Sequence, residues 1–244
     1  MTLLTVERVS KAFGGVRAVS DVSFTLAAGE LVGVMGPNGS GKTTLFNLIA
    51  GALAPDAGAI RLRGRDIAGC LAHRVCAWGV ARTFQLVRPF AGLTVLDNVL
   101  VGRLYGRARE GRGAATVEAT RLLGLVGLEG RAHLRAAQLT LIDKKRLELA
   151  RALATAPELL LLDEFMAGLN PTETESAMAL IRRLQGEGVT LLMVEHIVWA
   201  LMDLAQRIIV LSAGEKIADG APAAVAADPT VVDVYLGSAA GGAG

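Results

Sequence analysis

The chain has 244 residues, of which 52% are hydrophobic and only 4% aromatic. This length allows one large domain or a domain with an inserted lobe, and the apolar fraction excludes a disordered chain. The formal net charge of +2 gives no support for nucleic-acid binding. The apolar runs are too short to cross a bilayer, and residues 1–8 lack the pattern of a secretory signal, so we expect a cytoplasmic protein.

Two strands are predicted near the N-terminus, at residues 3–9 and 18–26, because polar and apolar residues are interleaved there. Residues 11–15 (KAFGG) between them form a turn that carries Phe13. A lone phenylalanine is most often a core residue. In a nucleotide-binding protein it could equally be a stacking platform for an adenine ring, and the pattern alone leaves both alternatives open.

A glycine-rich segment, residues 36–43 (GPNGSGKT), follows the apolar run 31–35 and precedes a helix-like stretch at 44–50. This is the spacing and context of a P-loop. Its glycines let successive N–H groups point at a phosphate chain, at the positive end of a helix. Lys42 can reach the β- and γ-phosphates, and the hydroxyl of Thr43 suits Mg²⁺. The predicted nucleotide-binding residues here are Gly36, Pro37, Asn38, Gly39, Ser40, Gly41, Lys42, Thr43 and Thr44.

The middle of the chain changes from strand to helical periodicity. A turn at 55–58 leads into a strand at 59–63, and a short strand at 79–85 ends in Gln85. From about 86 to 154 the apolar spacing becomes helical, with Gly-Arg-rich joints, which predicts a helical lobe inserted into an α/β core. The joints lack interleaved aromatic residues, so solvated loops are favoured over nucleic-acid contacts.

Acidic and basic side chains follow two predicted buried strands. Residues 159–162 (LLLL) precede Asp163 and Glu164, and residues 189–194 precede Glu195 and His196. Open α/β sheets bind ligands at the carboxyl ends of their strands. There Asp163 could hold Mg²⁺ through water, Glu164 could polarise the attacking water as a general base, and His196 could donate to the γ-phosphate.

The C-terminal part is predicted to contain two short strands within 207–219 and a helix at 228–236, and we expect residues 237–244 to form a flexible tail.

Taken together and in order, these motifs resemble the ATP-binding subunits of ABC transporters, from Phe13 to Leu236. The resemblance implies that Phe13 stacks on adenine, that Gln85 touches Mg²⁺ and couples to the membrane partner, and that Asp163 is the metal-binding aspartate. It implies that Glu164 is the catalytic glutamate and that His196 is the switch histidine.

The resemblance also implies the fold: a P-loop NTPase core of class α/β, with a mixed sheet flanked by helices, an N-terminal antiparallel β part and an inserted α-helical subdomain. We expect a single domain over 1–240, with 1–85 and 155–236 as the catalytic core and about 86–154 as the helical subdomain.

Two stretches look like the importers of branched-chain amino acids: residues 82–85 with 90–94, and residues 167–172. The ending over residues 228–237 looks similar too. The ATPases of lipopolysaccharide export and urea import are close relatives and remain alternatives. The implied cofactors are ATP and Mg²⁺. The implied partners are a second ATPase subunit, transmembrane permease subunits and, indirectly, a periplasmic solute-binding protein, with the chain on the cytoplasmic face of the inner membrane and no nucleic acid bound.

The signature segment departs from the family. Residues 139–143 read LTLID where the family has a sequence such as LSGGQ. Leu141 and Ile142 put bulk where backbone must approach a phosphate, and Asp143 would place a negative charge towards an anion. Thr140 and Asp143 keep the spacing of a helix cap. The sequence leaves open whether the second ATPase subunit is another copy of this chain (a homodimer) or a paralogue. The degenerate segment motivates the hypothesis of a heterodimer, in which this chain's own site is complete and the site it completes on its partner is degenerate.

Two other classes compete with a transport ATPase. A soluble ABC protein acting on ribosomes or DNA usually has two such modules or long coiled-coil insertions, which this chain lacks. A nucleotide-binding regulatory subunit with weak turnover is the other alternative, because of the degenerate signature segment.

Overall fold

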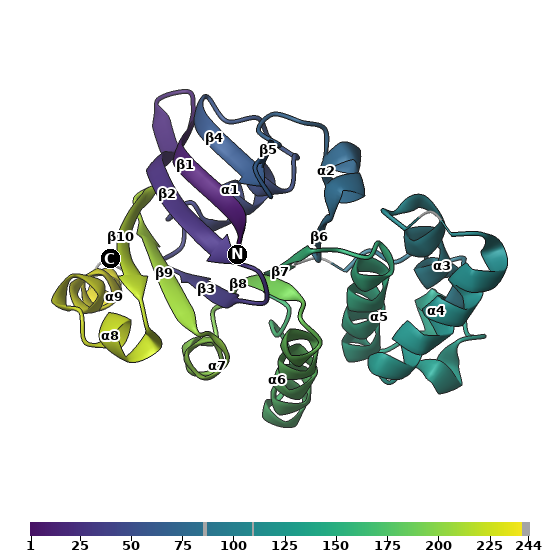
Figure 1. Cartoon of the computed structure of the whole chain (residues 1–244). Coiled ribbons are helices and arrows are strands. Elements are labelled where there is room, and N and C mark those ends of the chain that lie inside the picture. The colour runs from purple at the N-terminus through teal and green to yellow at the C-terminus, as the bar shows by residue number, and fades with distance from the viewer. Residues whose placement is uncertain (85–86, 109, 241–244) are drawn as a thin grey trace.

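The computed structural model describes residues 1–84, 87–108 and 110–240, and in these residues the strands form two sheets (Figure 1). The first sheet is antiparallel and has the order β2-β1-β4-β5. Its strands are β1 (Thr2–Phe13), β2 (Val16–Ala27), β4 (Ala57–Leu62) and β5 (Arg65–Asp66). The predicted turn at 11–15 shrinks to two residues, because Phe13 already pairs with Val16.

The second sheet has the order β10-β9-β3-β8-β7-β6, and only β10 in it is antiparallel to its neighbour. Its strands are β3 (Leu31–Met35), β6 (Val80–Arg82), β7 (Leu159–Asp163), β8 (Thr190–Val194), β9 (Arg207–Ser212) and β10 (Glu215–Gly220). Every residue of β3, β7 and β8 is buried. Continuous apolar runs are what strands covered on both faces require, which explains why these strands were recognisable from the sequence.

The side chains on the two faces of this sheet belong to two separate hydrophobic cores. Val32 and Val34 pack on the side of helix α1 (Lys42–Ile49) and the antiparallel sheet, where Phe46 is fully buried. Leu31 and Met35 pack on the opposite side, against the other helices. Because side chains alternate along a strand, β3 joins both cores, and the loop that follows it is anchored from both sides.

Some of the remaining helices form a separate lobe (Figure 1). The lobe contains α3 (Val95–Tyr105), α4 (Arg112–Leu125) and α5 (Leu141–Ala154), with the 3₁₀ turns Glu129–Arg131 and Ala136–Gln138. The others are α2 (Ala72–Trp78), α6 (Pro171–Gly186), α7 (Val198–Leu204), α8 (Pro222–Ala226) and α9 (Pro229–Ala240). Helices α6 to α9 lie below the second sheet, and α2 lies on the upper side next to β5 (Figure 1). The last helix was expected to end at 236 and continues to Ala240.

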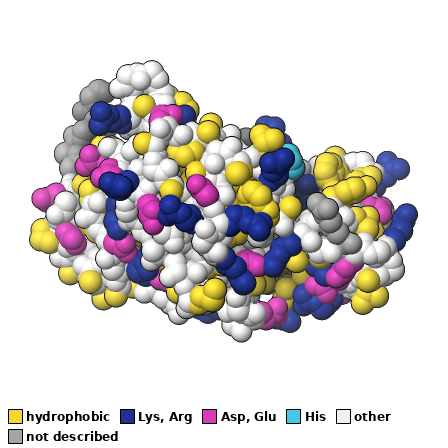
Figure 2. Space-filling model, turned by 45° about the horizontal axis from the view of Figure 1, so that its top comes forward, with side chains coloured by type: hydrophobic (Ala, Val, Ile, Leu, Met, Phe, Trp, Pro, Cys, Tyr) yellow, Lys and Arg dark blue, Asp and Glu magenta, His cyan; other side chains and the backbone are white. Residues whose placement is uncertain are grey.

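The face drawn in Figure 2 carries basic and acidic side chains intermingled with apolar ones. Across the described ranges, none of the helices combines the length and the hydropathy needed to cross a bilayer.

Candidate active site

The register of the parallel strands brings the sequence motifs to one sheet edge. Val34 of β3 and Asp163 of β7 both pair with Val194, the last residue of β8. The loop after β3, the acidic pair after β7 and the Glu195–His196 step after β8 therefore leave the sheet at the same level. This is the edge where open α/β sheets bind ligands.

The loop between β3 and α1 depends on glycine at two positions. Gly36 has φ +149°, and a Cβ there would lie 2.1 Å from the carbonyl oxygen of Leu211. Gly41 has φ +104°, and its Cβ would lie 2.3 Å from the carbonyl oxygen of Ala18. No side chain caps the start of α1 at Gly41. The backbone of Leu211 and Ala18 thus packs closely against the loop, leaving no room for side chains at Gly36 and Gly41. The loop leads into a helix N-terminus that suits an anion.

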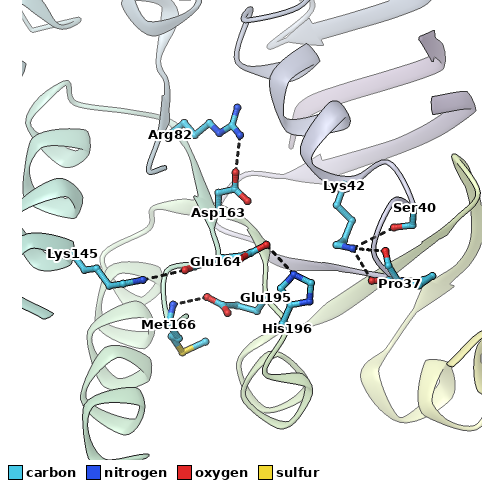
Figure 3. Close-up of polar contacts among 11 residues, drawn as sticks. Pro37, Ser40, Lys42, Arg82, Lys145, Asp163, Glu164, Met166, Glu195 and His196 are labelled. Atoms are coloured by element: carbon cyan, nitrogen blue, oxygen red, sulfur yellow. Dashed lines mark hydrogen bonds and ion pairs between the residues drawn. The ribbon is translucent and has the colours of Figure 1, made fainter. Parts of the chain in front are cut away.

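Lys42, the first residue of α1, folds back over this loop (Figure 3). Its Nζ donates to the carbonyl oxygens of Gly36 at 2.7 Å and Pro37 at 2.8 Å. Burial lowers the pKa of Lys42, and the negative charges of Glu164 and Asp163 oppose that shift. A phosphate chain in the loop would offer this ammonium a stronger partner than two neutral carbonyls.

Asp163, at the end of β7, is contacted by Arg82, the last residue of β6, and by Thr83, which follows it. Arg82 donates from Nη2 to its Oδ2 at 2.6 Å, and the Asp163 N–H donates to the Thr83 hydroxyl at 3.3 Å. The second terminal nitrogen of Arg82 donates to Asn47 of α1 at 2.6 Å. The local sequence pattern marks Asp163 but not the arginine that binds it.

Three neighbouring residues contact Glu164, and Figure 3 draws the contacts with His196 and Lys145. His196 Nε2 lies 2.9 Å from Oε1 of Glu164. The backbone N–H of Glu164 donates to the Val194 carbonyl at 2.9 Å. The Glu164 backbone has φ +50°, which is uncommon for a residue with a side chain. Lys145 of α5 donates to the main-chain carbonyl oxygens of Glu164 at 3.3 Å and Phe165 at 2.9 Å. Two predicted site residues are thus in direct contact, and Lys145 was not predicted.

Two buried glutamates flank this arrangement. Burial raises the pKa of Glu195 to about 7, against a hydrogen bond from the Met166 N–H at 2.7 Å that lowers it. Burial likewise raises the pKa of Glu148 on α5 to about 7, although it accepts a hydrogen bond from the Phe84 N–H at 3.2 Å. Burial also lowers the pKa of Lys145, opposed first by the charge of Glu195. The strand-end pattern marks Glu195 in the sequence, but Glu148 and Lys145 carry no such motif.

A cavity of about 690 Å³ lies where α1, α2, α3, α5, β6 and β7 converge, and Thr43, Arg82 and Asp163 line it. Phe13 lies apart from it, at the end of β1. Its side chain is 49% exposed, so it is not part of the core, and the Lys11 Nζ lies 5.7 Å from its ring centroid. Gln85, the remaining predicted site residue, lies outside the described residues.

The start of α5 differs from the expectation for Asp143. This side chain is only 4% exposed, accepts a hydrogen bond from the Thr140 hydroxyl at 2.5 Å and forms an ion pair with Arg131. Its charge is therefore turned inward and compensated, because the segment before α5 supplies an arginine that the local spacing does not reveal. Leu141, in contrast, is 53% exposed. Its side chain lies near Gly168, because a Cβ added to that glycine would be 3.7 Å from Cδ2 of Leu141.

These features define a P-loop nucleotide-binding cassette with an added helical lobe. A family model described as ABC transporter matches residues 19–167, and one described as branched-chain amino acid ATP-binding cassette transporter matches residues 215–241. The high-affinity branched-chain amino acid transport ATP-binding protein LivG of Salmonella typhimurium is 39% identical, over 97% of this chain and 98% of its own length.

Solved structures of ATP-binding cassettes have the same fold. The ADP conformation of MJ1267, an ATP-binding cassette of an ABC transporter, superposes with a TM-score of 0.87 at 30% identity, covering 97% of this chain and 99% of that one. A dimeric post-hydrolysis state of the cassette MJ0796, bound to ADP and phosphate, gives a TM-score of 0.80 at 26% identity over 90% and 99% of the two chains.

The chain therefore belongs to the ATP-binding proteins of ABC transporters, and among them to the branched-chain amino acid type. It binds ATP and is the ATPase subunit of a transporter complex, and the expected fold class is confirmed.

Proposed function

We propose that this subunit powers the import of branched-chain amino acids, acting from the cytoplasmic face of the inner membrane on transmembrane permease subunits that receive the solute from a periplasmic binding protein. The full-length similarity to LivG supports the solute class. The 2.9 Å contact between His196 and Glu164, beside the phosphate loop, supports turnover rather than nucleotide binding alone.

Each site residue has a role in this proposal. The loop backbone from Gly36 to Thr44 binds the triphosphate, and Lys42 exchanges its carbonyl partners for the β- and γ-phosphates. Glu164 orients the attacking water, and His196 donates to the γ-phosphate and positions Glu164. Phe13, exposed at the end of β1, stacks on the adenine.

The donor set at the loop fits Mg²⁺. Within the described part of the chain, no group of three or more His, Cys, Asp or Glu residues could cage a metal. Mg²⁺ bound with a nucleotide needs no such cage, because phosphates and water supply most of its oxygen ligands. Thr43 and Asp163 line one cavity and would supply a hydroxyl and a carboxylate, and Gln85 completes the proposed set. Mg²⁺ would offset the charge that develops on the phosphates.

The subunit is also proposed to pair with a different cassette. The exposed Leu141 and the neighbouring Ile142 occupy the helix start that would approach a phosphate bound by the partner, and side chains there keep backbone at a distance. The complete Lys42, Asp163 and Glu164 set belongs to this chain's own site. Hydrolysis at that site then needs an intact signature segment from a paralogous subunit.

Uptake of radiolabelled leucine, isoleucine and valine tests the solute. Cells that lack this gene should lose uptake, the wild-type gene should restore it, and the Lys42→Ala variant should not. Uptake that is unchanged in the deletion strain would overturn the assignment to branched-chain amino acids.

ATPase assays on purified proteins test the pairing. The isolated chain should show little activity, and mixing it with the cassette encoded by a neighbouring gene should raise the rate. A variant carrying Thr140→Ser, Leu141→Gly, Ile142→Gly and Asp143→Gln should gain activity on its own, once circular dichroism shows that it is folded. High activity of the isolated wild-type chain would contradict the proposal.

A further inference from the structure

We propose that Arg82 acts as an internal counter-ion for Asp163, holding its carboxylate in the absence of a divalent cation and setting how strongly nucleotide binding depends on that cation. This inference rests on the metal role proposed above for Asp163. Arg82 is thereby a positioning residue for the nucleotide site.

The Arg82–Asp163 pair is short and withdrawn from solvent. The Nη2–Oδ2 distance is 2.6 Å, and the two side chains are 8% and 6% exposed. Asn47 accepts from the other terminal nitrogen at 2.6 Å, and the guanidinium lies 5.9 Å from the ring centroid of Phe46 and 5.3 Å from that of Phe84. The arginine is thus fixed by Asp163 at the end of β7 (Figure 3), by Asn47 on the helix that starts at the phosphate loop, and by two aromatic rings.

Asp163 needs such a partner. A carboxylate with so little exposure is costly to keep ionised unless it is paired. The nearby ammonium of Lys42 donates to the carbonyl oxygens of Gly36 and Pro37 and to the Ser40 hydroxyl. Among the described residues, the ion pair that reaches Asp163 comes from Arg82.

A cation arriving with the nucleotide must share Asp163 with this guanidinium. Arg82, Asp163 and Thr43 line the same cavity, so a divalent cation at Thr43 and Asp163 would lie close to a fixed positive charge. Arg82 therefore has two opposite effects. It screens Asp163 from the phosphates when no cation is present, and it weakens the attraction of Asp163 for a cation.

Both effects change one measurable ratio: the Kd for a non-hydrolysable ATP analogue in EDTA divided by the Kd in saturating Mg²⁺. Removing the positive charge should weaken binding in EDTA and leave Asp163 freer for the metal. Calorimetric titration of the purified full chain should show the ratio rising at least about tenfold in Arg82→Met, equivalent to about 1.4 kcal/mol. Arg82→Gln, which keeps a donor group but no charge, should shift it in the same direction. Arg82→Gln replaces Arg82→Met in this test if the methionine variant does not fold.

Matched controls separate this effect from a general loss of charge. Arg88 lines the same cavity, and Arg88→Met should leave the ratio within about twofold of wild type. Arg82→Lys should likewise stay close to wild type, because it retains the charge. In the double variant Arg82→Met with Asp163→Asn, the ratio should fall below that of Arg82→Met alone.

Two failures can be told apart. If the ratio falls in Asp163→Asn but both neutral Arg82 variants match wild type, the metal role of Asp163 stands and the counter-ion inference is overturned. If Asp163→Asn leaves the ratio unchanged, the metal role fails as well.

Discussion

The ammonium group of Lys145 donates a 2.9 Å hydrogen bond to the main-chain carbonyl of Phe165, and a second one at 3.3 Å to that of Glu164. Lys145 is on α5, the helix that begins at the altered signature segment, and Glu164 is the proposed water-orienting residue. Glu164 also has a positive φ of 50°. A buried lysine from another element therefore helps to fix the backbone of a strained residue, together with the hydrogen bond from the Glu164 N–H to Val194.

Lys145→Met should lower the free energy of unfolding by about 2–4 kcal/mol. It removes charged hydrogen bonds to two carbonyls and the positive charge that lowers the pKa of Glu195. Chemical denaturation followed by circular dichroism measures this. Lys144→Met, next along the helix and partly exposed, is the matched control and should change stability by less than about 0.5 kcal/mol. An unaltered denaturation midpoint for Lys145→Met would contradict this reading.

Stability should depend on pH through Glu195, whose pKa burial raises to about 7. The folded state then holds its proton more tightly than the unfolded state, so this contribution is fully present below about pH 4.5 and is lost as pH rises through 7. Glu195→Gln keeps an oxygen to accept from the Met166 N–H. It should unfold with a free energy on the order of 1–3 kcal/mol higher than wild type at pH 8, with a smaller difference at pH 5.

Denaturation curves at both pH values check this, with the exposed Glu215→Gln as the control that should follow wild type. Equal stability of Glu195→Gln and wild type at pH 8 would mean that the buried carboxylate carries no penalty.

Phe13→Ala should weaken ATP binding about tenfold, because stacking of a base on an aromatic ring contributes about 1–3 kcal/mol. The ring is already exposed, so its removal should leave the fold intact. Phe90→Ala is the matched control: this ring is also exposed, and it packs on Arg151 at 4.6 Å instead. Calorimetry with ATP should show a loss for Phe13→Ala only. If Phe13→Ala and the wild type bind ATP with equal affinity, the adenine does not stack on Phe13.

The parts of the site that the sequence revealed are those with local patterns. Buried strands were visible as unbroken apolar runs, and the glycine loop and the polar residues at the strand ends follow them directly. Arg82 and Asp163 are 81 positions apart, and only the pairing of β6 with β7 makes them neighbours. Asp143 could not be read correctly either, since its charge is neutralised by Arg131 from a separate turn.

Helix α6 was not predicted, although a signal was present. Asn170 and Glu173 form a reciprocal capping box with Pro171 at the first helical position. That pattern marks a helix start on physical grounds, independently of the family motif in which it lies.

The central claim is that Glu164 of this chain drives ATP hydrolysis in the assembled transporter. The most direct test is the hydrolysis rate of the complete complex carrying Glu164→Gln, compared with wild type and with the exposed Glu175→Gln as control. Because the amide retains the shape and the contact to His196, we predict nucleotide affinity within about threefold of wild type and a rate at least about 100-fold lower. A rate within about twofold of wild type would contradict the account.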